Sequence, residues 1–191
     1  MSNNQIEIHI AAAENKVTKV INSYGKKKTY HNGGFRVGVS IEGEGDFICI
    51  TKSATYSGLA ESWGVLRAVE WAIAQGIKDL KVCTVDHCTS SRRKSGFFLK
   101  LAHAKAEVAG MTLDVERIGK EDNDAVDLAR DQDAKFLPRV ADDTEEVKAA
   151  IAIVLKSYET RDGEINPAAE EGMPELPVPE SVEINPELVE G

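Results

Sequence analysis

The N-terminal part of the chain alternates apolar and polar residues with the two-residue period of a β-strand. Ile6, Ile8 and Ile10 alternate with Glu7 and His9. This alternation predicts a half-buried first strand. Three consecutive alanines follow the strand directly.

Two further strands are predicted by the segment "GGFRVGVSIEGEGDFICITKS". Its apolar residues alternate on both sides of "EGEG", and the glycines at positions 43 and 45 favour a hairpin turn there. The N-terminal third is therefore predicted to contain three antiparallel strands. In this interpretation a long, basic connection over residues 14–32 joins the first strand to the second.

After Ser57, helical and extended patterns take turns. Apolar residues recur at helical spacing from Leu59 to Ile73 and stop at Gly76, a residue type that often ends helices. The remaining predicted elements are the strand "IKDLKVCTVD", a helix from Phe97 to Val108, the strand "MTLDVERI", and a last core helix from about Asp122 to Phe136. The order β-β-β-α-β-α-β-α predicts an α/β fold, with a mixed five-stranded sheet flanked by helices.

The C-terminal part of the chain differs from this core domain, which we assign to residues 1–138. Residues 139–163 contain an amphipathic helix, over about 142–160, that either docks on the core or binds a partner. Residues 164–191 hold eight glutamates and five of the six prolines, a composition that predicts disorder. This tail is either a solubilising segment or a short motif for a basic surface.

The net charge of −9 is concentrated in that tail, so the rest of the chain is close to neutral. Two segments, residues 15–41 and 87–106, contain Lys and Arg but no Asp or Glu. Such segments are either solvated loops or contacts to nucleic-acid phosphates. The candidate phosphate contacts are Lys26, Lys27, Lys28, Arg92, Arg93 and Lys94.

The cysteines and the hydropathy pattern bear on location and on metals. An odd number of cysteines, no signal-peptide pattern and no apolar run of the ~20 residues that span a bilayer lead us to expect a cytoplasmic protein without a membrane contact. Cys83, His87 and Cys88 lack a fourth ligand at zinc-site spacing, and Cys83 belongs to a buried strand. We therefore expect no zinc held by these three residues.

Three acidic residues come from three different predicted elements. Glu61 lies near the start of the first long helix, Asp86 at the end of a central strand, and Asp127 early in the last core helix. Ligands of open α/β sheets bind at the carboxyl ends of the strands. The three carboxylates form a candidate Mg²⁺ site there, because Mg²⁺ prefers oxygen ligands. The alternative is that each is a solvated surface residue.

Three segments in this order resemble the ribonuclease H family. They are "GGFRVGVSIEGEGDFICITKSATYSGLAES", "LKVCTVDHC" and "VERIGKEDNDAVDLAR", and the similarity covers roughly residues 5–136. The resemblance implies Mg²⁺- or Mn²⁺-dependent hydrolysis of the RNA strand of an RNA/DNA hybrid, with two metal ions about 4 Å apart. It also implies that Glu61, Asp86 and Asp127 are catalytic metal ligands.

The resemblance fails at two positions. The family carries Asp at the place of Ala11, and this chain has no Asp before Asp46. Lys120 stands roughly where the family commonly has a loop histidine, and lysine is a poor general base unless its pKa is strongly lowered. The implied metal site is therefore incomplete.

Three interpretations follow. The chain is a divergent ribonuclease in which Glu14, a water or the substrate phosphate completes the metal site. Alternatively, it is an inactive module of the same fold that binds nucleic acid or a protein partner. The third is that Ala11 is an engineered substitution made to trap a complex.

Overall fold

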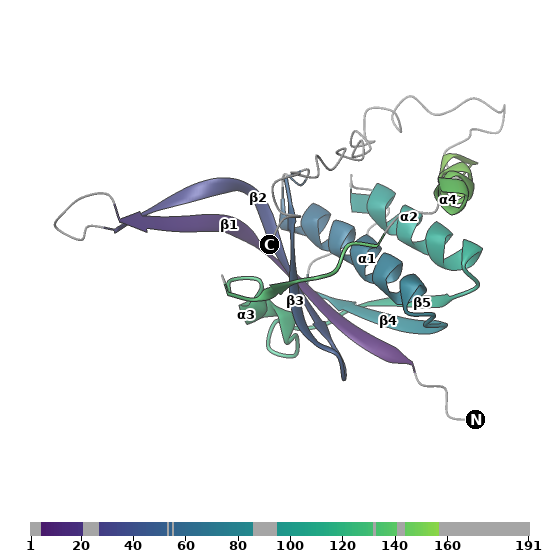
Figure 1. Ribbon diagram of the computed structural model, residues 1–191, viewed down its shortest axis with the longest axis horizontal. Coiled ribbons are helices and arrows are strands. Elements are labelled where there is room, and N and C mark those ends of the chain that lie inside the picture. Colours follow the sequence, from purple (N-terminus) through teal and green to yellow (C-terminus); the bar gives the residue numbers. More distant parts are fainter. Residues whose placement is uncertain are drawn as a thin grey trace, which may run out of the picture.

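The computed structural model describes residues 5–20, 27–52, 54, 56–85, 95–131, 133–140 and 144–156 (Figure 1). The strands are β1 (Ile6–Val20), β2 (Lys27–Ile41), β3 (Gly45–Thr51), β4 (Asp79–Thr84), β5 (Thr112–Arg117) and β6 (Lys135–Phe136). The helices are α1 (Ser57–Ala74), α2 (Ser95–Val108), α3 (Ala125–Leu128) and α4 (Thr144–Lys156).

All six strands form one mixed sheet in the order β5-β4-β1-β2-β3-β6. The pairs β1–β2 and β2–β3 are antiparallel, whereas β1–β4, β4–β5 and β3–β6 are parallel. The parallel pairs β1–β4 and β4–β5 follow from the helical crossovers, because α1 separates β3 from β4 and α2 separates β4 from β5. The predicted α/β class and mixed sheet are confirmed.

Helices cover both faces of the sheet. A methyl group added at Gly64 of α1 would lie 2.7 Å from Val37 Cγ1, so α1 packs tightly on the face to which Val37 points. At Gly38 the same test gives 2.5 Å to the carbonyl oxygen of Ala125, so α3 touches the opposite face. Glycine is required at position 38 because any side chain would push α3 away from the sheet.

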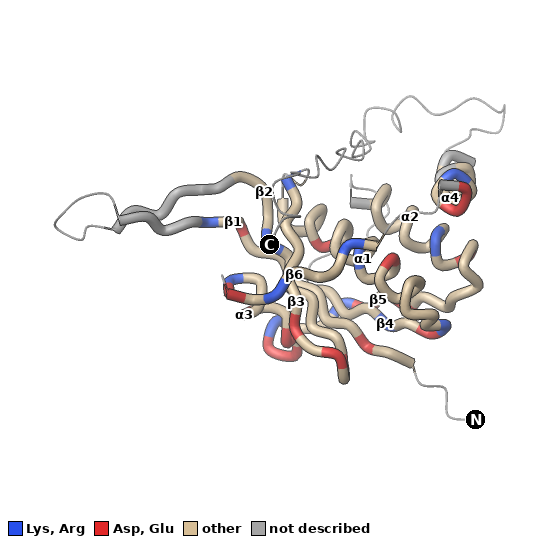
Figure 2. Tube along the Cα trace, in the orientation of Figure 1, with Lys and Arg blue, Asp and Glu red and all other residues tan. Residues whose placement is uncertain are grey.

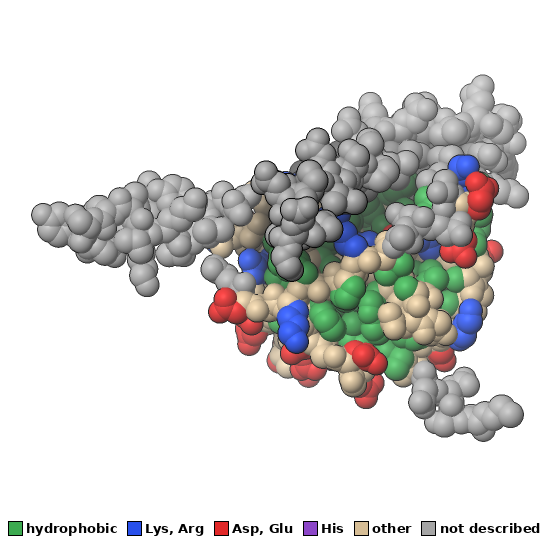
Figure 3. Space-filling view, viewed as in Figure 1, with side chains coloured by type: hydrophobic (Ala, Val, Ile, Leu, Met, Phe, Trp, Pro, Cys, Tyr) green, Lys and Arg blue, Asp and Glu red, His purple; other side chains and the backbone are tan. Residues whose placement is uncertain are grey.

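The main core lies between the sheet and α1. Its completely buried strand residues are Ile8, Ile10, Val37, Val39, Leu80 and Val82, and Val65 and Val69 of α1 pack among them. Apart from Val65, these residues are apolar positions of the predicted strands and helix. The helix α4 packs against α2 and adds Ala150 and Val154 to the same cluster. In the space-filling view, hydrophobic side chains gather over the helix-covered part of the body (Figure 3).

The connection between the first two strands differs from the prediction. Most of the predicted 14–32 connection is paired strand, since the β1–β2 register continues to Val20 opposite Lys27. The ribbon formed by β1 and β2 extends well beyond the other strands (Figure 1). The cross-strand ladder, rather than hydrophobic periodicity, maintains this extension, which explains why the apolar pattern did not reveal it.

The predicted last core helix is also wrong over most of its length. Only α3 is helical, and Lys135–Phe136 forms a sixth strand where the prediction had five. The extended chain allows Leu137 to enter the core and to donate its N–H to the carbonyl of Ile48 at 2.9 Å. Phe136, counted as an apolar helix position, is 64% exposed.

Some predictions fall on residues outside this description. They include Asp86, Lys26, Arg92, Arg93, Lys94 and the tail at 164–191. Within the described part of the chain, none of the helices has the length and apolar character that crossing a membrane requires.

Candidate functional site at the strand fork

The carboxylate of Glu61 lies where two central strands separate. The parallel pairing of β1 with β4 runs to Ile10 and Thr84, after which β4 ends and β1 continues. We call this point the strand fork. Glu61 is 2% exposed, and its carboxylate accepts the N–H of Ala12 at 3.4 Å and the N–H of Val85 at 3.2 Å. The carboxylate thus bridges β1 and the end of β4 in place of ladder hydrogen bonds.

The side chain of Asn123 closes the same fork with the opposite hydrogen-bonding groups. Its amide nitrogen donates to the carbonyls of Ile10 at 3.1 Å and Cys83 at 3.4 Å. Its side-chain oxygen accepts the N–H of Ala125 at 3.0 Å, which fixes the start of α3. Asn123 is only 4% exposed. Glu61 satisfies N–H groups of the two strands, and Asn123 satisfies their carbonyl groups.

Ala11 stands at the fork, where the resemblance implies an aspartate. It pairs with Gly38 of β2 and is 4% exposed. Paired residues point to the same face of a sheet, so the Ala11 methyl group points to the face on which α3 lies. A methyl group offers a metal ion no ligand atom.

Glu14 does not replace the missing carboxylate in this geometry. It lies three positions after Ala11 along the strand, a rise of about 10 Å. Its carboxylate lies 2.8 Å from the Lys16 ammonium, and both side chains are about half exposed. Glu14 is thus an exposed strand residue paired with its neighbour.

The two other predicted metal ligands are not brought to Glu61 by the described residues. The Asp127 side chain is 98% exposed, and the Arg130 guanidinium lies 3.4 Å from it within the same turn. Asp86 lies outside the described residues and directly follows Val85, the residue that donates to Glu61. The joint metal site of Glu61, Asp86 and Asp127 therefore remains a prediction. Of these three residues, only Glu61 is located at the strand fork. Lys120, in the segment before α3, is exposed.

The basic candidates are described only in part. Lys26 and the segment 92–94 lie outside the described residues, and for Lys27 and Lys28 only the backbone is described. The β1–β2 register places Lys28 directly opposite Lys19 and Lys27 opposite Val20. By contrast, acidic residues occupy the β2–β3 turn and the segment before α3 (Figure 2). Residues 15–41, which include most of the ribbon, contain Lys and Arg but no acidic residue.

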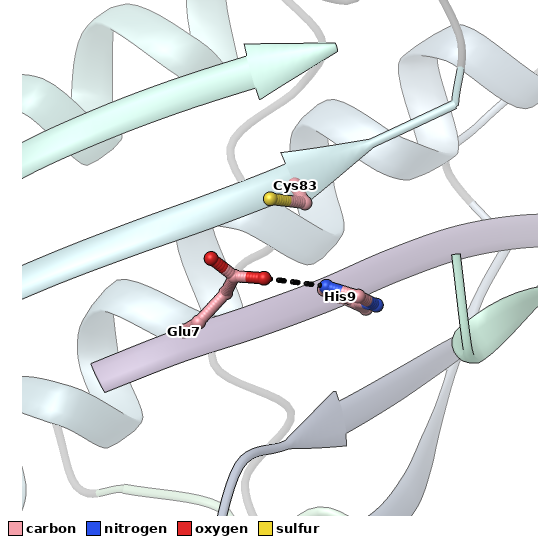
Figure 4. A group of neighbouring side chains, drawn as sticks. All are labelled: Glu7, His9 and Cys83. Carbon is pink, nitrogen blue, oxygen red and sulfur yellow. Dashed lines mark hydrogen bonds and ion pairs between the residues drawn. The ribbon is translucent and has the colours of Figure 1, made fainter. Parts of the chain in front are cut away.

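A different group of side chains could hold a metal ion. The ligand atoms of Glu7, His9 and Cys83 all lie within 4.8 Å of one another, and these residues form the one such group in the part of the chain that the structure describes (Figure 4). The carboxylate of Glu7 accepts from His9 Nε2 at 2.9 Å, and Lys81 lies 3.0 Å from its other oxygen.

Burial and neighbouring charges determine the protonation of Glu7 and Cys83. The hydrogen bond from His9 and the Lys81 ammonium lower the pKa of Glu7, so this carboxylate is ionised at neutral pH. Burial raises the pKa of the Cys83 thiol to about 11, so the thiol is protonated there. Carboxylates of Glu7 and Glu116 raise the pKa of Lys81.

The sequence contains a signal for part of this group. Glu7 and His9 are two residues apart on one strand and therefore share a face. Cys83 is opposite His9 only because β4 pairs with β1 in that register. The register of parallel strands depends on the intervening helix crossover, which the periodicity of single strands does not reveal.

We compared the chain with family models, with curated proteins and with solved structures, and none of them matches it.

Proposed function

We propose that this chain is a ribonuclease H-like module that binds double-helical nucleic acid, an RNA/DNA hybrid foremost, without cleaving it. The strand arrangement supports the fold part of the proposal. Three antiparallel strands, β3-β2-β1, are followed across the sheet by the parallel strands β4 and β5. The sequence pattern predicts this combination of three antiparallel strands followed by β-α-β units.

The observation that carries the binding proposal is the charge of the projecting β1–β2 ribbon. Lys19 and Lys28 are directly opposite each other, and residues 15–41 contain no acidic residue. Like charges placed opposite each other destabilise an antiparallel pair. A polyanion relieves this repulsion and releases counterions from its own phosphates. The ribbon thus gains stability from the ligand that its charge attracts.

Two observations support the absence of cleavage. Ala11 provides no ligand atom where two metal ions would share one, and Glu61 is engaged with two backbone N–H groups. In the family that the three segments resemble, the aspartate at this place is shared by the two metal ions. Without it, the two cations that stabilise the attacking and leaving oxygens lose their common ligand. At the strand fork, the carboxylate of Glu61 holds β1 and the end of β4 together.

The binding test uses fluorescence anisotropy of a labelled RNA/DNA hybrid over a series of salt concentrations. We compare the full chain with a variant carrying Lys26→Gln, Lys27→Gln and Lys28→Gln. Each phosphate contact contributes about −0.9 to the slope of log affinity against log salt, so the variant should lose up to about 3 units of slope. Duplex DNA and duplex RNA measured in parallel show which helix geometry is preferred.

The matched control changes the same charge elsewhere. Lys78→Gln, Lys135→Gln and Lys148→Gln remove three exposed lysines outside the ribbon. This variant should keep the salt slope of the unmodified chain. Equal losses in both variants would indicate non-specific attraction and would reject the ribbon as the binding surface. If neither variant matters but deletion of residues 164–191 or changes on α4 do, the partner is a protein.

A second candidate function is metal-dependent hydrolysis of the hybrid, favoured by one observation. Val85 donates its N–H to Glu61, and Asp86, which lies outside the described residues, follows Val85 directly in the sequence. Cleavage of a labelled hybrid in Mg²⁺ and then Mn²⁺ tests this candidate. Turnover by the unmodified chain that disappears in Asp86→Asn would establish an enzyme and contradict our proposal.

The variant Ala11→Asp separates two reasons for inactivity. Turnover only in this variant would mean that the scaffold is intact and that the missing oxygen alone prevents cleavage. No turnover in either protein agrees with a strand fork that serves structure. Both outcomes are compatible with binding, which the anisotropy measurement decides independently.

A further inference from the structure

The group formed by Glu7, His9 and Cys83 lies on one face of two adjacent strands. Glu7 and His9 are two residues apart on β1, and the register places Cys83 of β4 directly opposite His9. Figure 4 shows the carboxylate, the imidazole and the thiol turned toward one another. All three ligand atoms lie within 4.8 Å of one another. Because the two strands are hydrogen-bonded neighbours and the ligand atoms are already close, the three ligands need little rearrangement to meet one ion.

The chemistry of these three groups selects the type of metal. Thiolate, imidazole and carboxylate together are a ligand set for Zn²⁺, whereas Mg²⁺ avoids sulfur and takes oxygen ligands. Three protein ligands leave a fourth tetrahedral position for a water or another small ligand. This group therefore differs in kind from the carboxylates at the strand fork.

Neighbouring groups orient the histidine. The Asp124 N–H donates to His9 Nδ1 at 3.1 Å, so Nε2 carries the hydrogen that is donated to Glu7. The Asp124 carboxylate also lies 3.5 Å from Nδ1. When a metal takes Nε2, the ring hydrogen moves to Nδ1. The Asp124 N–H then gives up Nδ1 as its acceptor, and the Asp124 carboxylate can accept the Nδ1 hydrogen instead. A carboxylate behind the ligating histidine is the common outer partner in zinc sites.

Burial leaves the site accessible from one side. Cys83 is 1% exposed, whereas the side chains of His9 and Glu7 are 15% and 38% exposed. A cation thus reaches the thiol past Glu7. Lys81 competes there, but it also contacts Glu116 at 3.1 Å and keeps that partner when it leaves Glu7.

We propose that Glu7, His9 and Cys83 bind one Zn²⁺ ion on the face of the sheet that α3 touches. Binding converts the Cys83 thiol into a zinc-bound thiolate and releases its proton to solvent, while His9 stays neutral through the shift of its hydrogen from Nε2 to Nδ1. The ion ties β1 to β4. This site is independent of the proposed nucleic-acid binding.

The test is titration of the chelator-treated full chain with zinc by calorimetry, together with the absorption spectrum of the Co²⁺ form. One ion should bind per chain, and Co²⁺ should give the charge-transfer band of a thiolate ligand. Cys83→Ser should abolish this band and weaken zinc binding by more than the roughly 10–100-fold that loss of an outer partner costs. Cys49→Ser, at another buried free cysteine, should change neither.

Three further variants distinguish loss of the zinc site from misfolding and from zinc binding at a different site. Glu7→Gln changes a partly exposed side chain and should also weaken zinc binding, by at least about tenfold. Lys81→Gln removes the competing ammonium and should tighten zinc binding roughly twofold to fivefold, as expected for a partly exposed ion pair. His87→Ala should leave zinc binding unchanged.

Three results would overturn the proposal. One is stoichiometric zinc binding that survives both Glu7→Gln and Cys83→Ser. Another is loss of binding in His87→Ala but not in Glu7→Gln, which would place the ion on Cys83, His87 and Cys88. Saturation with Mg²⁺ in the calorimeter should not displace zinc, and displacement would likewise contradict the assignment.

Discussion

The strand fork and the Glu7–His9–Cys83 group lie within a few residues of each other on β1, yet they use polar side chains in opposite ways. At the fork, Glu61 and Asn123 are buried, and their side chains form hydrogen bonds with backbone groups of β1 and of the end of β4. In the group, the ligand atoms of the side chains face one another. A side chain engaged with the backbone holds strands together, whereas mutually facing ligand atoms leave room for an ion.

This difference shows that the type of a residue does not determine its task. Glu61 of α1 and Glu7 of β1 both place a carboxylate beside the paired strands β1 and β4. Glu61 replaces missing ladder hydrogen bonds, which a buried polar group must do unless another partner satisfies it. Glu7 pairs with a histidine and a lysine near the surface and can exchange these partners for a cation.

The largest expected effect comes from Glu61→Ala. It leaves two backbone N–H groups without their acceptor in a buried place, which should lower the free energy of unfolding by about 2–5 kcal/mol. Urea denaturation measures this change, with Glu107→Ala, an exposed glutamate of α2, as the control. If Glu61 were instead a metal ligand without a cation to balance its charge, its removal should stabilise the protein. An increase in the free energy of unfolding would therefore contradict the structural role that we assign to the strand fork.

Zinc should stabilise the folded chain through the other region. At a free concentration one hundred times the dissociation constant, a ligand that binds only the folded state adds about 2.7 kcal/mol to the free energy of unfolding. Chemical denaturation with and without zinc measures this, and chelation should reverse it. The increase in the free energy of unfolding caused by zinc should be absent in Cys83→Ser. It should be present in Glu61→Gln, even if that variant is less stable without zinc. A gain lost in Glu61→Gln would couple the two regions.

Asn123→Ala should have a somewhat smaller effect. The change removes donors from two strand carbonyls and the acceptor for Ala125 N–H, which should cost about 2 kcal/mol. Hydrogen exchange should show faster exchange at the start of α3, because its anchoring bond is gone. A uniform loss of protection throughout the sheet would mean that Asn123 supports the whole fold.

Asp127→Asn should have the smallest effect. Its carboxylate is 98% exposed and forms a long pair with Arg130, so the free energy of unfolding should change by less than about 0.5 kcal/mol. Thermal denaturation in the presence and absence of Mg²⁺ measures it. A Mg²⁺-dependent stabilisation of the unmodified chain that Asp127→Asn removes would show that Asp127 joins a metal site.

The sequence predicted the elements whose side chains follow a clear period. The alternation at Ile6 to Ile10 and the helical spacing from Leu59 to Ile73 correspond to β1 and α1, and the glycines at 43 and 76 end their elements as expected. The last predicted helix was wrong because the need to bury Leu137 and to pair it with Ile48 outweighs a weak helical pattern. Tertiary pairing overrides local preference in such segments.

The sequence by itself determined the α/β class, the buried faces of the strands and the concentration of basic residues between positions 15 and 41, because these depend on periodicity and composition. Only the tertiary structure decided that Glu61 and Asn123 close the strand fork and that Cys83 stands opposite His9. Both outcomes depend on the register of β4 against β1. That register forms only when α1 returns the chain to the sheet, so residues more than seventy positions apart become neighbours without any mark in the local pattern.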